Sequence, residues 1–189
     1  SAGTSVTLIS QGDISLDDNL TVFPAAAVTL LLDTSSGSGN VLLNSSIVAS
    51  VGSPLNLRIA SGGDIALGNA GTFPDQFNTN GGNVQLRAVN NIAFNGNLST
   101  AGGSLTATSS FGSMAANSST ISLNLGGGSA LFGAAQAINI QSLLTTSRLS
   151  AVTANGGISL SSLAAPSESV EIAKVGNPDS SFFPGFAGA

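Results

Sequence analysis

The sequence predicts an all-β protein, a parallel β-helix of about eight stacked coils, from three observations. First, one short phrase recurs: "SQGDISL" at 10–16, "GSGNVLL" at 37–43, "SGGDIAL" at 61–67 and "NGGNVQL" at 80–86. Second, 42% of the 189 residues are apolar and only 7% are charged, which suits strands better than exposed amphipathic helices. Third, the apolar residues occur in short alternating runs. Such repetition is typical of equivalent turns stacked on one another.

The first strand of each coil is marked by a short run in which apolar and polar residues alternate and β-branched residues are frequent. Gly and Asn bound each run, and both accept the backbone conformations of tight corners. Successive runs start 18 to 29 residues apart, and the variation lies in segments of Gly, Ser, Asn and Pro. We expect these strands to begin at Val6, Val28, Leu55, Val84, Leu105, Leu131, Leu149 and Val170.

The second strand of each coil follows the Gly–Asn/Asp corner of the recurring phrase, and a third, weaker run comes after it. Strands this short form no stable sheet within one turn, but equivalent strands of neighbouring turns can pair as continuous parallel sheets. We expect second strands at Ile14, Val41, Ile65, Ile92, Ile121, Ile138 and Ile158, and third strands at Leu20, Ile47, Leu98 and Leu143. The first four second strands should align as one column of core residues.

Two alternatives for the fold remain open at this stage. An antiparallel sandwich also has many short strands, but it predicts hairpins and no fixed cycle of three strands. Segment 109–135 fits the repeat least well, and "ALFGAAQAINI" at 130–140 is also compatible with a short helix. We divide the chain into repeats at 1–175, with an insertion loop at 68–82, and a tail rich in Phe, Pro and Gly at 176–189.

The composition excludes several classes of function. Four basic and nine acidic residues give a net charge of −5, which provides no basic surface for nucleic acid. The longest apolar run, "VFPAAAVTLLL" at 22–32, is too short for a membrane span, so we expect no membrane insertion. His and Cys are absent, which removes His-based triads, thiol nucleophiles and ordinary zinc sites. We therefore expect no catalytic residue, no metal and no cofactor.

Four polar residues occupy one position of the repeat. Asp13, Asn40, Asp64 and Asn91 each precede the aliphatic residue of a predicted second strand. In stacked coils such side chains lie in one column, where they can bond along the rod axis or accept hydrogen bonds from corner amides. We predict that they form a structural ladder. A row of calcium ions is the alternative, although only two of the four side chains are carboxylates.

Arg58 and Arg87 end similar phrases, "LNLR" and "VQLR", in neighbouring coils. We expect them to lie side by side on the outer face, with Asp75 of the intervening insertion as their partner. Together with Phe73 and Phe77 of that insertion, they form our candidate binding site for a carbohydrate or an anion, because insertions on solenoids often carry function. The structural alternative is an exposed ion pair of little energetic weight.

Asp13, Asp17 and Asp18 form the densest acidic group of the chain. Paired carboxylates at a corner could cleave a glycosidic bond, which is the enzymatic alternative for this fold. Charges near the end of a stack also discourage edge pairing, and this structural role is the one we predict. Ice binding would need a sustained Thr-x-Thr column, which the sequence lacks.

The C-terminal segment "SSFFPGFAGA" contains Phe182, Phe183 and Phe186. An open solenoid end exposes unpaired backbone and apolar core, so it needs a cap or a partner. We expect this tail either to fold back as the cap or to dock into the next subunit and promote end-to-end assembly.

The phrases "SGGDIAL", "NGGNVQLRAVNNIAFNGNLSTAGGSLTAT" and "ANGGISLSSL" resemble the repeats of filamentous-haemagglutinin-like large exoproteins, the secreted partners of two-partner secretion systems. The resemblance covers residues 5–175 and implies a right-handed parallel β-helix. It also implies export across the outer membrane and a role in adhesion, biofilm or surface structure. The "NPNG" and "NPNL" motifs of the family's secretion domain are absent, so the resemblance implies a piece of the shaft or a stand-alone relative.

We therefore expect a non-enzymatic structural or adhesive element, which the resemblance places among proteins secreted to the bacterial cell surface. Its expected partner is a surface carbohydrate or a protein receptor. Two alternative functions remain: a subunit of a self-assembling extracellular filament, whose partner is a second copy, and a polysaccharide lyase or hydrolase on the same fold.

Overall fold

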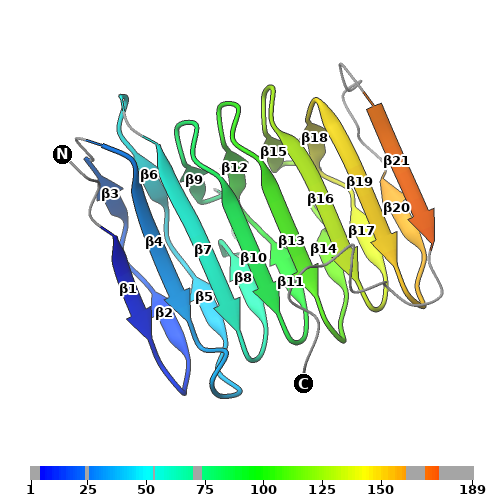
Figure 1. Ribbon diagram of the computed structural model, residues 1–189, viewed down its shortest axis with the longest axis horizontal. Helices are drawn as coiled ribbons and strands as arrows, with labels where there is room; N and C mark the ends of the chain where they lie inside the picture. Colours follow the sequence, from blue (N-terminus) through cyan, green and yellow to red (C-terminus); the bar gives the residue numbers. More distant parts are fainter. Residues whose placement is uncertain (1–4, 24–25, 53, 70–73, 161–168, 175–189) are drawn as a thin grey trace.

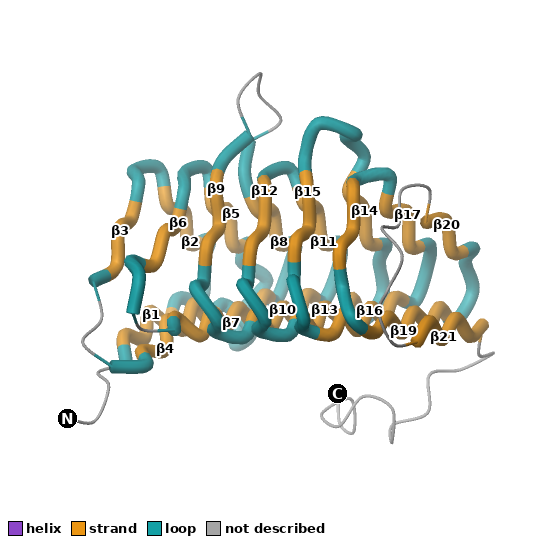
Figure 2. The backbone as a smooth tube through the Cα atoms, turned by 90° about the horizontal axis from the view of Figure 1, so that it is seen from above, coloured by secondary structure: helices purple, strands orange, loops and turns teal. Residues whose placement is uncertain are grey.

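The computed structural model describes residues 5–23, 26–52, 54–69, 74–160 and 169–174, and all of their regular structure is β-strand (Figure 1). The strands form three sheets, and every strand pair in them is parallel. The chain passes from one sheet to the next in a fixed order and then returns to the first, so that three strands make one coil (Figure 2). The prediction of a parallel β-solenoid is confirmed, and the sandwich alternative is wrong.

The longest strands form an eight-stranded sheet along one side of the rod (Figure 2). Its strand order is β1-β4-β7-β10-β13-β16-β19-β21, which is the order in which the coils follow one another. The strands span Val6–Ile9 (β1), Val28–Asp33 (β4), Leu55–Ser61 (β7), Val84–Ala88 (β10), Leu105–Ser109 (β13), Ser129–Ala134 (β16), Arg148–Thr153 (β19) and Ser169–Lys174 (β21). Each of the eight predicted first strands is found here.

The other two sheets contain strands of three residues, seven in one sheet and six in the other. The seven-stranded sheet contains Ile14–Leu16 (β2), Val41–Leu43 (β5), Ile65–Leu67 (β8), Ile92–Phe94 (β11), Met114–Ala116 (β14), Ile138–Ile140 (β17) and Ile158–Leu160 (β20). The six-stranded sheet contains Leu20–Val22 (β3), Ile47–Ala49 (β6), Gln76–Asn78 (β9), Asn97–Ser99 (β12), Ser122–Asn124 (β15) and Leu143–Thr145 (β18). The described residues thus complete six three-stranded coils, fewer than the eight expected, and β19, β20 and β21 follow them.

The predicted core column is present in the seven-stranded sheet. Ile14 pairs with Val41, Val41 with Ile65, and Ile65 with Ile92. Val41, Ile65 and Ile92 are at most 1% exposed, because coils cover them on both sides. In each of these three-residue strands the first and third side chains point into the core and the middle one points outward. Each of the two inward positions therefore forms a buried apolar column along the rod.

The structure corrects three assignments between residues 68 and 140. The second strand of the fifth coil is β14, which begins at Met114, whereas Ile121 lies just before β15 of the third sheet. Strand β9 lies within segment 68–82, so part of the expected insertion loop is a regular strand. Segment 130–140 contains β16 and β17 and no helix. Met114–Ala116 has no β-branched residue, which explains why its strand was missed.

Large side chains fill the centre of the rod. Phe77, Phe94 and Phe132 are all at most 1% exposed. The rings of Phe94 and Phe132 meet edge to face, with centroids 6.4 Å apart and an interplanar angle of 71°. That geometry is a favourable one for aromatic pairs. The core is therefore continuous from coil to coil, and it holds the outer faces of the sheets in fixed positions.

Candidate functional site

A depression of about 490 Å³ lies on the outer face of the eight-stranded sheet. We call it the outer groove. It extends over five neighbouring strands, β4, β7, β10, β13 and β16. It is lined by Leu31, Asp33, Arg58, Ile59, Ala60, Gln85, Leu86, Arg87, Thr106, Thr108 and Leu131. Because it crosses strands, the outer groove runs along the axis of the rod.

Strand alternation fixes which side chains face the outer groove. In β7, Leu57 and Ile59 point into the core and are at most 3% exposed, whereas Arg58 between them is exposed. In β10, Leu86 is buried while Gln85 and Arg87 on either side of it are exposed. The core columns therefore anchor these strands, and their polar neighbours are held outward on a rigid sheet.

The two arginines are not directly opposite each other, contrary to our expectation. Arg58 pairs in register with Gln85, and Arg87 pairs with Ala60. The reason is that Val84 aligns with Leu57 rather than with Leu55, which shifts β10 by two residues. The Cα atoms of Arg58 and Arg87 are consequently about 8 Å apart on the diagonal, given usual strand dimensions. This offset weakens the repulsion between the guanidinium groups.

Among the described residues that line the outer groove, Asp33 is the one carboxylate. Its Oδ1 accepts hydrogen bonds from the backbone N–H of Ser35, at 2.8 Å, and from the Ser35 hydroxyl, at 2.6 Å. These bonds tie the carboxylate to the turn that follows β4. With two arginines and one aspartate, the lining carries a net positive charge in a chain whose net charge is −5.

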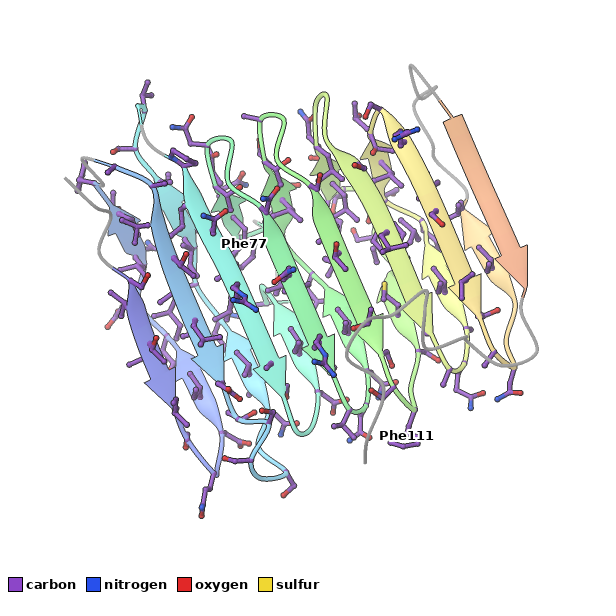
Figure 3. All side chains as sticks on the ribbon, viewed as in Figure 1. Phe77 and Phe111 are labelled. Atoms are coloured by element: carbon purple, nitrogen blue, oxygen red, sulfur yellow. The ribbon has the colours of Figure 1, made fainter. Side chains whose placement is uncertain are left out.

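The remaining residues of the candidate binding site lie elsewhere. Phe77, labelled in Figure 3, is 1% exposed and belongs to the core, so its expected role in a surface site is wrong. Asp75 lies at the corner between β8 and β9, where its Oδ2 accepts a hydrogen bond from the Asn69 N–H at 2.9 Å. That corner joins the seven-stranded and six-stranded sheets and does not belong to the eight-stranded sheet that carries Arg58. Phe73 lies outside the described residues.

The predicted ladder residues are linked from coil to coil. The Asp13 Oδ1 accepts hydrogen bonds from the Asn40 backbone N–H and side-chain amide, at 2.7 and 3.2 Å. The Asn40 Oδ1 accepts from the Asp64 N–H at 2.8 Å, and the Asp64 Oδ1 accepts from the Asn91 backbone and side chain at 2.8 and 3.0 Å. The Asn91 Oδ1 continues the ladder to the Ser113 N–H at 3.0 Å. Each side chain therefore binds a corner amide of the next coil.

The alternation of Asp and Asn in this ladder keeps carboxylates two coils apart. Replacing Asn40 by Asp would place three carboxylates in successive coils, each about 4.8 Å from the next. We expect Asn40→Asp to lower the free energy of unfolding by about 1–2 kcal/mol at neutral pH, measured by urea denaturation, because each like-charge contact at that distance costs about 1 kcal/mol in water.

The matched control for this prediction is Asn91→Asp, which gains one carboxylate neighbour, Asp64, because Ser113 follows it. Its effect should be about half as large, and both effects should shrink in 1 M salt. If the two variants are equally stable, or if salt leaves the difference unchanged, charge repulsion does not govern the ladder.

Similar ladders, which sequence reasoning missed, lie at the other two corners. The Ser46 N–H donates to the Asn19 Oδ1 at 3.0 Å, and the Ser46 Oγ accepts from the Gln76 N–H at 2.9 Å. At the corner before the eight-stranded sheet, the Asn83 N–H donates to the Asn56 Oδ1 at 3.0 Å. A polar side chain immediately before a predicted strand would have revealed Asn19, Ser46 and Asn83, but not Asn56, which is the second residue of β7.

Asp17 is held in its ionised form. Its Oδ1 accepts hydrogen bonds from the Asn44 amide and the Ser15 hydroxyl, both at 2.8 Å. These bonds, first that from Asn44 and then that from Ser15, hold the pKa of the Asp17 carboxyl below its ordinary value. A general acid for glycoside cleavage needs the opposite shift. The geometry therefore suits Asp17 to bridging two coils rather than to donating a proton.

The hydrogen bond from Asn44 gives a pH-dependent prediction. Because the folded pKa of Asp17 lies below the unfolded value, its contribution to stability is complete above the unfolded pKa, about 4, and is lost as the pH falls through the folded pKa. We expect Asn44→Ala to raise the folded pKa toward the ordinary value, as followed by the carboxyl carbon resonance in an NMR titration. An unchanged titration midpoint in the variant would contradict this assignment.

Comparison of the chain with protein-family models, curated protein sequences and solved structures finds no match to any of them. Among the described residues, no group of three or more His, Cys, Asp or Glu side chains is placed to hold a metal ion. No helix suited to crossing a membrane is found in the described ranges. The predicted cap or assembly residues Phe182, Phe183 and Phe186 lie outside them.

Sequence reasoning identified the two arginines of the outer groove and missed the residues around them. Gln85, Thr106 and Leu131 occupy the position of Arg58 on successive strands, since Arg58 pairs with Gln85, Gln85 with Thr106, and Thr106 with Leu131. These residues could have been found by following the outward positions of the first strands along the stack. Following those positions requires knowing which residues pair between neighbouring strands, and the spacing of the phrases does not determine this pairing.

Proposed function

We propose that the protein is a non-enzymatic structural and adhesive element, secreted to the bacterial cell surface and related to filamentous-haemagglutinin-like exoproteins. The observation that carries this proposal is the outer groove, whose described lining has two arginines and one aspartate and extends across five strands of a repetitive rod. A rigid solenoid presents side chains from successive coils at fixed intervals, which suits adhesion through repeated contacts. The repeated phrases quoted above support the family relationship.

The composition of the outer groove favours binding over catalysis. Cleavage of a glycosidic bond needs a pair of carboxyl groups on opposite sides of the bond. Among the described lining residues, Asp33 is the single carboxylate, and its Oδ1 is already bonded to Ser35. The guanidinium groups of Arg58 and Arg87 contribute charge and hydrogen-bond donors to the outer groove.

Two measurements on the source bacterium test the proposed function. Immunogold labelling of intact cells with an antibody against the chain should decorate the cell surface. Deletion of the gene should lower attachment of the cells to abiotic and cell-coated surfaces, and the wild-type gene should restore attachment. Labelling that appears only after lysis, or attachment that is independent of the gene, would overturn the proposal.

A second candidate function is a filament subunit, and the N-terminal end of the rod favours it. Val6 and Leu8 of β1 are 49% and 50% exposed, although they occupy the same inward columns as Leu30 and Leu32, which are 7% and 3% exposed. The difference arises because, among the described strands, β1 pairs with β4 alone. An apolar edge strand of this kind is a template for pairing with another strand.

Negative-stain microscopy of the purified protein distinguishes the two functions. Filaments that lengthen with protein concentration, and that disappear when Leu8 is replaced by Glu, would support end-to-end assembly. Dispersed rods at high concentration would contradict it and leave the adhesive function as the better supported of the two.

A further inference from the structure

We propose that the outer groove binds a carboxylated polysaccharide, a chain of uronate sugars that lies along the rod axis. This inference rests on the proposed adhesive function, since it assigns a ligand class to the same surface. It is carried by the direction of the outer groove, the placement of two guanidinium groups in it and the neutral hydrogen-bonding side chains beside them.

The direction of the outer groove selects a polymer that crosses the strands. Its lining residues come from β4, β7, β10, β13 and β16, which are successive strands of one sheet. At about 4.8 Å per strand, this length corresponds to roughly 19 Å along the rod axis. The arginines, Gln85 and the two threonines lie on the three central strands. The outermost strands contribute Leu31 and Asp33 on β4 and Leu131 on β16. A ligand segment of a few sugar units fits this length.

The charge of the outer groove selects repeated anions. Arg58 and Arg87 both project outward, two residues out of register on neighbouring strands and about 8 Å apart at their Cα atoms. A guanidinium group presents two parallel N–H donors that match the two oxygens of a carboxylate. Two such groups at a fixed separation favour a ligand with carboxylates at regular intervals over one with a single charge, because the second contact forms intramolecularly.

The neutral groups of the outer groove favour a sugar over an acidic peptide. Strand β10 is paired on both sides, with β7 and with β13, so its backbone amides are used within the sheet. A peptide therefore cannot add to the sheet at this place, which removes the main-chain hydrogen bonds by which extended peptides are usually held. The side chains of Gln85, opposite Arg58, and of Thr106, on the strand beyond it, instead offer an amide and a hydroxyl suited to sugar hydroxyl groups.

Calorimetry with the full chain and polygalacturonate, in low-salt buffer containing EDTA, tests the inference. We expect binding that weakens as salt is added. Arg58→Gln and Arg87→Gln should each reduce the affinity at least tenfold, and the double variant should abolish measurable binding, because each removes charge-assisted hydrogen bonds. Arg58→Lys keeps the charge but loses the paired donors, so we expect an intermediate loss of about threefold to tenfold.

The matched control is Arg148→Gln, since Arg148 is exposed on β19 of the same sheet but does not line the outer groove. Its affinity should stay within twofold of the wild type, and circular dichroism should show all variants folded. Fully methyl-esterified polygalacturonate should not bind.

Three outcomes would overturn the inference: no binding of polygalacturonate, equal losses in Arg148→Gln and Arg58→Gln, or tighter binding of dextran sulfate or polyglutamate at the same arginines. Surface labelling and gene-dependent attachment of cells, observed together with any of these outcomes, would leave the proposed function standing and remove the ligand class alone.

Discussion

Replacement of Phe77 by Ala is expected to lower the free energy of unfolding by about 3–5 kcal/mol, the range observed when a buried aromatic ring is removed from a core. Phe77 is 1% exposed and lies between Ile47 and Leu98 in the inward column of the six-stranded sheet. Its ring occupies the space where a side chain at Gly96 would lie, since a Cβ there would be 2.7 Å from the Phe77 Cε2. Truncation would therefore leave a cavity between coils. Urea denaturation followed by circular dichroism measures the loss.

Phe111→Ala is the matched control, because it removes the same group from a corner. Phe111 is 70% exposed and lies at the periphery of the fold (Figure 3). Its replacement should change stability by less than about 0.5 kcal/mol. Equal losses in the two variants would contradict the placement of Phe77 in the core. A folded Phe77→Ala protein with unchanged affinity for polygalacturonate would further separate the core from the binding surface.

The first strands could be predicted because their pattern extends over several alternations. In β7, three inward residues alternate with outward ones before Ser61, so the periodicity is unambiguous. Strand β9 has a single inward apolar residue, Phe77, between Gln76 and Asn78. One apolar residue between polar ones is equally compatible with a loop, and Phe77 was therefore assigned to an insertion rather than to the core.

The register of neighbouring coils could not be predicted, and the outer groove depends on it. The corner between β9 and β10 contains Asn80 and Gly81 with φ angles of +46° and +92°, and Val84 emerges opposite Leu57. The number of residues that such a corner uses depends on its backbone conformation, not on its length in the sequence. The matching phrases "LNLR" and "VQLR" predict that the arginines lie side by side, whereas in the structure they are two residues out of register.

The ladder was predictable for the opposite reason. Asp13, Asn40, Asp64 and Asn91 each stand next to a column residue that is fixed by burial, so their relative positions follow from the core itself. The bonds that they form required the structure, because a carboxylate oxygen can face either solvent or the next coil. Positions adjacent to the core are therefore predicted best in this fold, and positions that depend on corner conformation are predicted worst.

Replacement of Gly128 by Ala is the second change for which we expect a large effect, a loss of about 3 kcal/mol in the free energy of unfolding. A methyl group on Gly128 would lie 2.1 Å from the carbonyl oxygen of Gly103 in the preceding coil. Overpacking of this kind usually costs about 1–3 kcal/mol. We expect the upper end, since the Gly128 carbonyl also accepts hydrogen bonds from Ser147 N–H and Thr146 Oγ1, at 2.9 and 2.8 Å, which restrain the corner.

The neighbouring residue provides a control within the same corner. A methyl group on Gly127 would meet no atom within 4 Å, so Gly127→Ala should change stability by less than about 0.5 kcal/mol. Thermal and urea denaturation of the two variants therefore compare one added methyl group at adjacent positions. Similar losses of stability in the two variants would mean that the corner requires glycine for its backbone conformation. A loss confined to Gly128→Ala would mean that the corner requires glycine because successive coils approach closely there. We expect this result, because Gly82 and Gly103 are equally close to the coils before them. A Cβ at either position would lie 2.1 Å from a carbonyl oxygen.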